Sequence, residues 1–521
     1  MSEPGGPGRE AEPPPEAPAP QGGVLRRAHI TLFGSGAGAA LAILNEILCA
    51  RYLGVNTYGL YALALILARV AEGVAIAGLP LATLHHVSIY RDQGSRPLVL
   101  GTILASVLPP LVIGVVLATV LWLLAPVLAE RVFGNPGAAG FIRAMAFAIP
   151  FMGLSEILGV ITRGFGRAAH YVLIRNLVPP VVFLALLLVV ISHRADPHWV
   201  PAAFGTAYAT AAVVGIASVL GVAGTALFRV KASFPFRALY TYSLPVLLNN
   251  LLYLVVATAS ILMLGVLHSD KEVGIFRACM QIVLPFDMVV IAFNASVGHL
   301  YPVLENNNRR EELARLVETI TRWMSALALA MLLVIALNRH DLIGLMGPDF
   351  VDGGDTLLAL AVGHAMLCSV GSAGFLLMMS RRQKIETGNA AVAAVLSVVL
   401  NWLFIPLWGS LGAAVATTLA CLAVSFLRVF QVRRTMDIPV VRLSLLRVVG
   451  LAALAALAML ALAAWLPIGE GSGLAWMGLR IVLAAILYGA LYWFLGMDRE
   501  GREAVRGAIR HYRAGREASP S

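Results

Sequence analysis

LVLGTILASVLPPLVIGVVLATVLWLLAPV, residues 98–127, runs without a single charged side chain. A bilayer core of about 30 Å is crossed by about 20 helical residues, so this stretch is long enough to span it. Comparable apolar stretches recur along the chain, and we expect about 14 spans. They begin near Ile30, Tyr58, Leu98, Phe141, Tyr171, Ala202, Leu239, Gly274, Ile320, Thr356, Asn389, Leu411, Leu445 and Met477. The sequence therefore predicts an all-α polytopic membrane protein.

Charged side chains are scarce and unevenly distributed. They make up 13% of the 521 residues, whereas a soluble domain carries roughly a quarter. Basic residues gather on every second connection, at Arg26, Arg27, Arg91, Arg96, Arg163, Arg167, Arg229, Lys231, Arg237, Arg309, Arg310, Arg315, Arg381, Arg382, Lys384, Arg433, Arg434, Arg442 and in the C-terminal tail. The other connections hold only Arg51, Arg131, Arg194, Lys271 and Arg339. This asymmetry predicts cytoplasmic termini and explains the net charge of +10 without a nucleic-acid partner.

The chain divides into two halves at a basic, aromatic segment, GTALFRVKASFPFRA at 224–238, which is too polar to span. We expect one six-helix bundle over 24–225, a second over 226–435 and two added helices over 436–497. Residues 1–23 are rich in Pro, Gly and Glu and are predicted to form a disordered cytoplasmic tail. Residues 498–521 place arginines three or four apart, which predicts a basic cytoplasmic tail that contacts anionic lipids.

A weak internal repeat relates the two halves. Leu53-Gly54-Val55 and Tyr58-Gly59-Leu60-Tyr61 resemble Leu264-Gly265-Val266 and Val273-Gly274-Ile275-Phe276. Both copies lie between the first and second span of a half and begin on the same side of the membrane. Parallel repeats of this kind predict two bundles that face each other around a central cavity.

Three sequence stretches carry a resemblance to a known family: ARYLGVNTYGLYALAL (50–65), LMGPDFVDGGDTLLALAVGHA (345–365) and RRQKIETGNAAVAAVLSVVLNWLFIPLWGSLGAAVATTLA (381–420). Together with the plan of about 14 spans, they resemble the Wzx-type oligosaccharide flippases of the polysaccharide transporter family. The superfamily also contains multidrug exporters and lipid II flippases, and these two functions remain alternatives.

The resemblance implies an alternating-access transporter of the bacterial inner membrane. Its implied substrate is an undecaprenyl-diphosphate-linked oligosaccharide, moved from the cytoplasmic to the periplasmic leaflet for synthesis of O-antigen, capsule or exopolysaccharide. A polysaccharide polymerase and a chain-length regulator are the implied protein partners.

Ionisable groups inside apolar spans are costly and therefore mark functional candidates. Arg69 and Arg277 are our predicted ligands of the diphosphate, because a guanidinium binds phosphate oxygens with two parallel hydrogen bonds. Glu72, three residues after Arg69, can pair with it on one helical face. The further substrate-binding candidates, for sugar hydroxyls, are the polar residues Asn249, Asn250 and Asn294. The structural alternatives are that Arg69 only neutralises Glu72, that Arg277 lies at the outer interface, and that the asparagines form interhelical hydrogen bonds.

Buried carboxylates are candidates for ion coupling. Glu46, Glu156 and Asp287 each fall within a span, where desolvation can raise a carboxyl pKa towards the physiological range. Protonation could then bias one orientation of the bundles. The alternative is that these carboxylates are paired or interfacial, and His364 is a further ionisable group in the tenth span.

Motifs for other chemistry are missing from the sequence. It contains no GxxxxGK[ST] loop for ATP, no HExxH and no GxSxG. The four cysteines, Cys49, Cys279, Cys368 and Cys421, have no metal-ligand spacing and are expected to be packing residues. We therefore predict a transporter without cofactor, metal or catalytic residues. A membrane polymerase or ligase, the competing class, would place its working residues on a longer outer loop.

Overall fold

The computed structural model describes residues 21–380, 382–440, 443–465, 474–497 and 502–503. Within these ranges the secondary structure is helical and contains no strand. Eleven helical segments of the described chain are long and apolar enough to cross a membrane. The prediction of an all-α polytopic membrane protein is confirmed. Of the predicted tails at 1–23 and 498–521, residues 1–20, 498–501 and 504–521 lie outside the described residues, whereas a helix already begins at Gln21.

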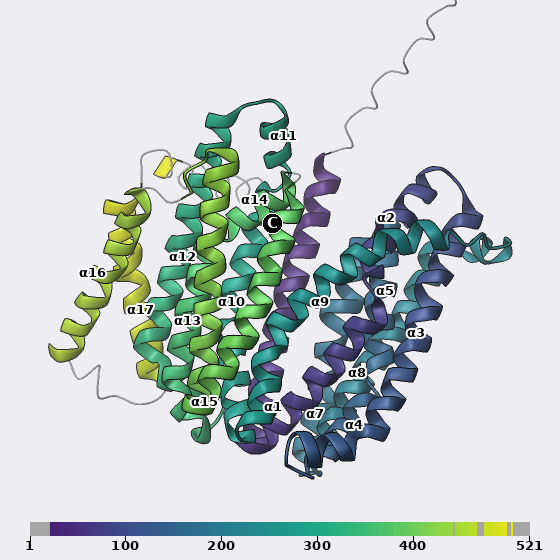
Figure 1. Cartoon of the computed structure of the whole chain (residues 1–521), viewed down its shortest axis with the longest axis horizontal. Coiled ribbons are helices and arrows are strands. Elements are labelled where there is room, and N and C mark those ends of the chain that lie inside the picture. Colours follow the sequence, from purple (N-terminus) through teal and green to yellow (C-terminus); the bar gives the residue numbers. More distant parts are fainter. Residues whose placement is uncertain (1–20, 381, 441–442, 466–473, 498–501, 504–521) are drawn as a thin grey trace, which may run out of the picture.

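Figure 1 shows two bundles and an appended helix pair. The N-terminal bundle contains α1 (Gln21–Ile76), α2 (Leu79–Asp92), α3 (Arg96–Val127), η1 (Leu128–Val132), α4 (Ala138–Ala146), α5 (Ile149–Gly164), α6 (Ala168–Tyr171), η2 (Val172–Leu177), α7 (Val178–Ser192) and α8 (Trp199–Ala223). The C-terminal bundle contains α9 (Phe236–Leu267), α10 (Asp270–Val297), α11 (Leu300–Asn306), α12 (Arg310–Gly344), η4 (Pro348–Gly353), α13 (Gly354–Ser369), α14 (Gly371–Met379) and α15 (Gln383–Met436). The appended pair is α16 (Leu443–Trp465) and α17 (Leu474–Leu491), followed by η5 (Tyr492–Gly496).

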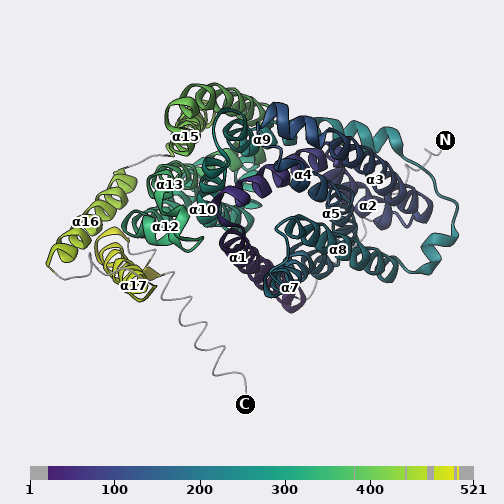
Figure 2. The same cartoon turned by 90° about the horizontal axis from the view of Figure 1, so that it is seen from below.

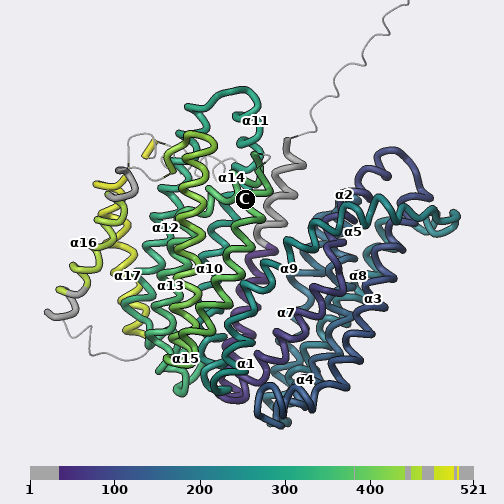
Figure 3. Tube along the Cα trace, viewed as in Figure 1, coloured from purple at the N-terminus to yellow at the C-terminus, as the bar shows by residue number. Residues whose placement is uncertain are grey.

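Two of the membrane-spanning segments are long enough to cross twice. The helical segments Gly34–Asp92 and Gln383–Met436 contain 59 and 54 residues, and the chain reverses inside each of them (Figure 3). The reversals occur at Gly54 (φ 70°) and Gly409 (φ 54°), backbone conformations that a residue with a Cβ rarely adopts. We call the end of the molecule that holds these turns the hairpin face, and the opposite end, where α1 begins, the terminal face.

The two bundles are joined at the hairpin face by the predicted repeat itself. A Cβ on Gly59 would lie 2.0 Å from the Asp270 carbonyl oxygen, and one on Gly274 would lie 2.2 Å from the Val55 carbonyl oxygen. The equivalent glycines of the two repeats therefore pack against each other, and no side chain fits between the backbones. Asn135 adds a hydrogen bond from its Nδ2 to Oδ2 of Asp270, at 2.6 Å. We call this contact the seam.

Helix α9 bridges the two bundles. The linker before it, which includes η3 (Thr225–Arg229), runs along the outside of the N-terminal bundle (Figure 2). The first turns of α9 pack on α2, since a Cβ on Gly78 would lie 2.6 Å from the Ser243 carbonyl oxygen. Further along, Ser260 of α9 accepts a hydrogen bond from Nδ2 of Asn401 in α15, at 3.0 Å. One helix thus contacts both bundles at different depths.

The appended helices pack on α12 rather than on the N-terminal bundle. Leu333 of α12 forms an apolar cluster with Ala455 and Met459 of α16 and with Tyr488 of α17. Arg480 of α17 pairs with Asp341 and donates a hydrogen bond from Nε to Oδ1 of Asn338, at 2.9 Å. Asn338 interrupts the helical backbone of α12 at φ −125°. These contacts place the pair outside the two bundles, as Figure 1 shows.

Candidate functional site

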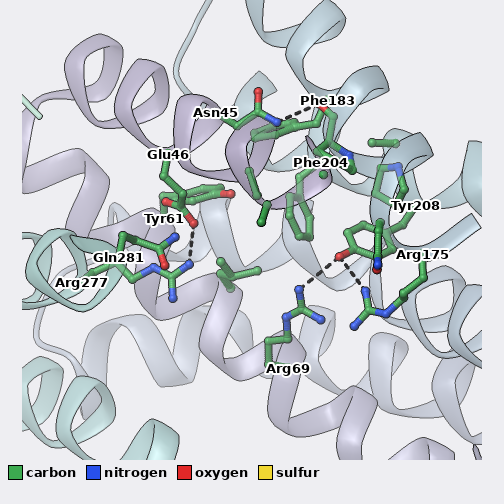
Figure 4. A pocket seen from close by; sticks show the side chains of 18 of the residues that line it. Asn45, Glu46, Tyr61, Arg69, Arg175, Phe183, Phe204, Tyr208, Arg277 and Gln281 are labelled. Atoms are coloured by element: carbon green, nitrogen blue, oxygen red, sulfur yellow. Dashed lines mark hydrogen bonds and ion pairs between the residues drawn. The ribbon is translucent and has the colours of Figure 1, made fainter. Parts of the chain in front are cut away.

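A cavity of about 500 Å³ lies between α1, η2, α7 and α8 of the N-terminal bundle and α10 of the C-terminal bundle (Figure 4). We call it the first pocket. Its polar lining consists of Ser35, Asn45, Glu46, Tyr61, Arg69, Arg175, Asn176, Tyr208, Arg277 and Gln281. The pocket therefore brings three guanidinium groups to one space from α1, η2 and α10.

Arg69 and Arg175 meet at one phenol oxygen. Arg69 donates from Nη2 to the Tyr208 hydroxyl at 3.1 Å, and Arg175 donates from Nη1 to the same oxygen at 3.2 Å (Figure 4). Each guanidinium also pairs with its own carboxylate, Arg69 with Glu72 at 3.0 Å and Arg175 with Glu156. Two positive charges are thus held close together at the pocket wall, each next to its own carboxylate.

The position of Arg175 depends on the local backbone. It lies in the π-helical turn η2, directly before the Pro179-Pro180 pair that begins α7. A proline cannot donate to the preceding turn, so the helix widens there, and π-turns are frequent at functional sites. The carbonyl oxygen of Pro180 also accepts a hydrogen bond from Nδ2 of Asn45 at 2.8 Å.

Arg277 occupies the other wall of the first pocket. Its Nη2 lies 2.5 Å from Oε1 of Glu46, and Oε2 of Glu46 accepts a hydrogen bond from the Tyr58 hydroxyl at 2.6 Å. Among the described residues, Nε of Arg277 is buried without a hydrogen-bond partner. This pair joins α10 of one bundle to α1 of the other. The seam lies one helical turn away, at Gly274.

A second pocket of about 240 Å³ lies in the C-terminal bundle. It is lined by Tyr253, Asp287, Val290, Ile291, Asn294, Leu367, Gly371, Gly374, Phe375, Met378, Glu386 and Arg428. Glu386 pairs with Arg428 and accepts hydrogen bonds from the Tyr253 hydroxyl and from Nδ2 of Asn389, both at 3.3 Å. Asn389 in turn exchanges two hydrogen bonds with Gln431, at 2.7 and 2.8 Å. The ion pair is held in a closed network.

The predicted site residues divide between these two pockets. Arg69, Arg277 and Glu46 line the first pocket, while Glu72 and Glu156 pair with its arginines. Asp287 and Asn294 line the second pocket. Asn249 and Asn250 lie on α9, outside the lining of both pockets as the structure describes them, and their role stays a prediction.

Sequence reasoning missed Arg175, Glu386, Arg428 and Tyr208. The first three obey the rule that singled out Arg69, since each is an ionisable group within or at the edge of an apolar span. Applied to every span, that rule would have found them. Tyr208 gave no signal, because a tyrosine in an apolar helix is ordinary packing until its partners are known.

Arginine-lined cavities of this kind suit an anionic ligand. Each guanidinium can bind a phosphate or carboxylate with two parallel hydrogen bonds, and the attraction strengthens where water is excluded. In the first pocket each arginine faces a matching carboxylate, so the site is charge-balanced without a ligand. An entering anion would compete with Glu46, Glu72 and Glu156 for the same donors.

Comparisons with known proteins agree with this architecture. The chain has the fold of a lipid II flippase MurJ in an inward closed conformation, at a TM-score of 0.65 and 12% identity, covering 90% of this chain and 98% of that one. It also resembles an inward-facing multidrug resistance MATE family transporter of the MOP superfamily, at a TM-score of 0.58 and 16% identity over 78% and 94% of the two chains. A MOP superfamily transporter from Pyrococcus furiosus aligns at a TM-score of 0.54 and 14% identity, over 79% and 95%.

The sequence itself matches two family models. No curated protein matches the chain. The MatE model matches residues 245–407, and the model described as polysaccharide biosynthesis protein matches residues 24–307. This multi-pass membrane protein has the MOP-superfamily fold, and its relatives are transporters and flippases rather than enzymes. Because the second match spans more than half of the 521 residues, the chain belongs to the polysaccharide biosynthesis protein family.

Proposed function

We propose that this protein is a Wzx-type flippase that moves an undecaprenyl-diphosphate-linked oligosaccharide from the cytoplasmic to the periplasmic leaflet of the bacterial inner membrane. The product would be an O-antigen, a capsule or an exopolysaccharide. One observation carries the proposal: Arg69, Arg175 and Arg277 converge on a single cavity at membrane depth. A diphosphate is the part of such a substrate that must leave the headgroup layer, and three guanidiniums can donate hydrogen bonds to its oxygens in place of their carboxylates.

Alternating access fits the way in which the bundles are joined. The seam at Gly59 and Gly274 holds them together at the hairpin face. Arg91 and Arg163 lie in the last turns of α2 and α5, and Arg382 follows α14. By the positive-inside rule the terminal face is cytoplasmic, and so are both chain ends. Opening of the seam would then release the headgroup into the periplasm.

Competition inside the first pocket supports ion coupling. When phosphate oxygens take the donors of Arg175 and Arg277, Glu156 and Glu46 lose their partners in a water-poor site. A carboxylate without its cation favours the protonated form. Substrate binding and proton uptake would therefore be linked at these carboxylates. A polymerase and a chain-length regulator would receive the flipped product, and anionic lipids would contact the basic C-terminal tail.

The test combines gene deletion with substitution of Arg69. Deletion in the host should cause undecaprenyl-diphosphate-linked oligosaccharides to accumulate, measured by mass spectrometry, while surface polysaccharide disappears. Wild-type protein restores export, Arg69→Ala restores none of it at equal membrane abundance, and Arg69→Lys restores part. Normal export with Arg69→Ala would remove this arginine from the mechanism.

The match of residues 245–407 to MatE favours a multidrug exporter as the second candidate. Unchanged glycolipid pools together with increased drug sensitivity of the deletion strain would support that function. Three cavity arginines argue against it where the drugs are cationic. Accumulation of lipid II in place of other lipid-linked glycans would instead indicate a lipid II flippase.

A further inference from the structure

The two pockets share one helix, α10, as part of their walls. Arg277 and Gln281 line the first pocket, and Asp287 and Asn294 line the second. Ten residues separate Arg277 from Asp287, which is about 15 Å along a helix. A glycan of a few sugars attached to a diphosphate at Arg277 would reach this distance. The direction along α10 leads from the hairpin face towards the terminal face.

Two side chains that line the second pocket, Asn294 and Asp287, carry acceptor oxygens. Asn294 is 7% exposed, and among the described residues its Oδ1 is buried without a hydrogen-bond partner. The Asp287 side chain is 45% exposed, and its Oδ1 lies 3.6 Å from Nδ1 of the buried His364. Such a site suits a ligand that is rich in donors.

The guanidinium of Arg428, the cation of the second pocket, is already paired with a carboxylate. Arg428 is held by Glu386, and that carboxylate is held further by Tyr253 and Asn389. An additional small cation would lie in the field of the Arg428 guanidinium, which also lines the pocket. Neutral hydroxyl donors meet no such repulsion. The rings of Tyr253 and Phe375 supply the apolar surface on which the carbon–hydrogen face of a sugar can pack.

The size of the second pocket points to one ring. Its volume of about 240 Å³ is below the range of roughly 300–1,000 Å³ for sites that take drug-sized ligands. Gly371 and Gly374 let neighbouring side chains approach closely, since a Cβ on Gly374 would lie 2.7 Å from Nε of Arg428 and one on Gly371 would lie 3.0 Å from the Val290 side chain. A single sugar fits this description better than an extended chain does.

We propose that the second pocket is a carbohydrate subsite that binds one sugar ring of the lipid-linked glycan, with Asn294 and Asp287 accepting hydrogen bonds from its hydroxyls. This assignment rests on the proposed function, because it takes the glycan to be attached to a diphosphate in the first pocket. It gives the two pockets different tasks. The arginines of the first pocket bind the diphosphate, which all such substrates share, and the second pocket selects the sugar.

The test compares two lipids on purified full-length protein in nanodiscs. One is undecaprenyl diphosphate, and the other is the lipid-linked glycan pool extracted from the deletion strain; native mass spectrometry measures both affinities. Wild-type protein should bind the glycosylated lipid about tenfold more tightly, as expected for a few added hydrogen bonds. Asn294→Ala should remove about three- to tenfold of that preference and leave undecaprenyl diphosphate binding unchanged. Asn307→Ala, an exposed asparagine after α11, is the matched control.

Asp287 keeps the test decisive if Asn294→Ala folds poorly. The Asp287 side chain is partly exposed, so Asp287→Ala should fold, lose the preference for the glycosylated lipid, and regain most of it as Asp287→Asn. Equal wild-type affinity for both lipids would overturn the subsite but leave the proposed function standing. Binding of neither lipid would overturn the proposed function itself. If the variants instead changed the sodium dependence of undecaprenyl diphosphate binding, the pocket would be a cation site.

Discussion

Both pockets contain arginine–carboxylate ion pairs, but the surroundings of these pairs differ. In the first pocket the arginine side chains Arg69, Arg175 and Arg277 are 32%, 24% and 16% exposed. In the second, Arg428 is 13% exposed, and its carboxylate is held by a tyrosine, as Glu46 is in the first pocket, and in addition by the amide of Asn389. An arginine that keeps donors towards a cavity can bind a ligand, whereas one inside a closed network mainly positions its neighbours. Surroundings, more than residue type, separate the two roles.

The largest expected effect comes from replacing each pair by neutral residues of similar size. Arg175→Met with Glu156→Gln should reduce polysaccharide export by about 100-fold or more, because two charge-assisted contacts to phosphate are lost. Arg428→Met with Glu386→Gln should reduce it less than about tenfold, since the second pocket loses only positioning. Export is measured as surface polysaccharide at equal membrane abundance. Equal losses from both double variants would erase the distinction between the pockets.

Replacing only the arginine of an ion pair should lower the stability of the protein more in the second pocket than in the first. Arg428→Ala leaves Glu386 buried without its cation, at a cost of about 3–5 kcal/mol. Adding Glu386→Gln should recover most of this loss. Thermal unfolding in detergent, followed by size-exclusion chromatography, measures both steps. Arg175→Ala is the comparison in the first pocket and should cost less, because the Glu156 side chain that it leaves unpaired is 18% exposed, against 7% for Glu386. A larger loss from Arg175→Ala would contradict the closed network.

How much of this could be predicted from the sequence depends on the range of the interaction. Apolar runs of spanning length fixed the helices, because the bilayer imposes length and apolarity locally. The repeat that contains Gly59 and Gly274 could also be recognised in the sequence. That the two glycines touch each other could not be inferred, since contact between remote helices leaves no periodic pattern.

The pockets were harder to predict than the spans. Arg69 and Glu72 were recognised as a pair from their spacing of three residues, and the structure confirms it. Glu156 has its cation 19 positions away, at Arg175, and Glu46 reaches Arg277 across the two bundles. Rarity in a span marks a charge as important. It does not name the partner, which depends on how helices from different parts of the chain are arranged.

A smaller effect is expected at the seam, which positions one wall of the first pocket. Gly274 lies one helical turn before Arg277, and its Cβ in Gly274→Ala would meet the Val55 carbonyl. We expect a loss of about 1–3 kcal/mol in unfolding free energy, typical of overpacking, and weaker diphosphate binding in the first pocket. Glycan preference at the second pocket should persist. Gly388→Ala in α15 is the control, because nothing lies within 4 Å of that Cβ.

The smallest effect is expected from an ion pair outside both pockets. Lys271 Nζ lies 2.9 Å from Oδ2 of Asp352, and the two side chains are 41% and 75% exposed. Pairs as exposed as this contribute about 0–1 kcal/mol, because water and salt screen them. Lys271→Met with Asp352→Asn should leave unfolding and export within error of wild type. A large loss of stability or export would mean that an ion pair matters equally whether it is exposed or buried. The closed network would then not be needed to explain the difference between the two pockets.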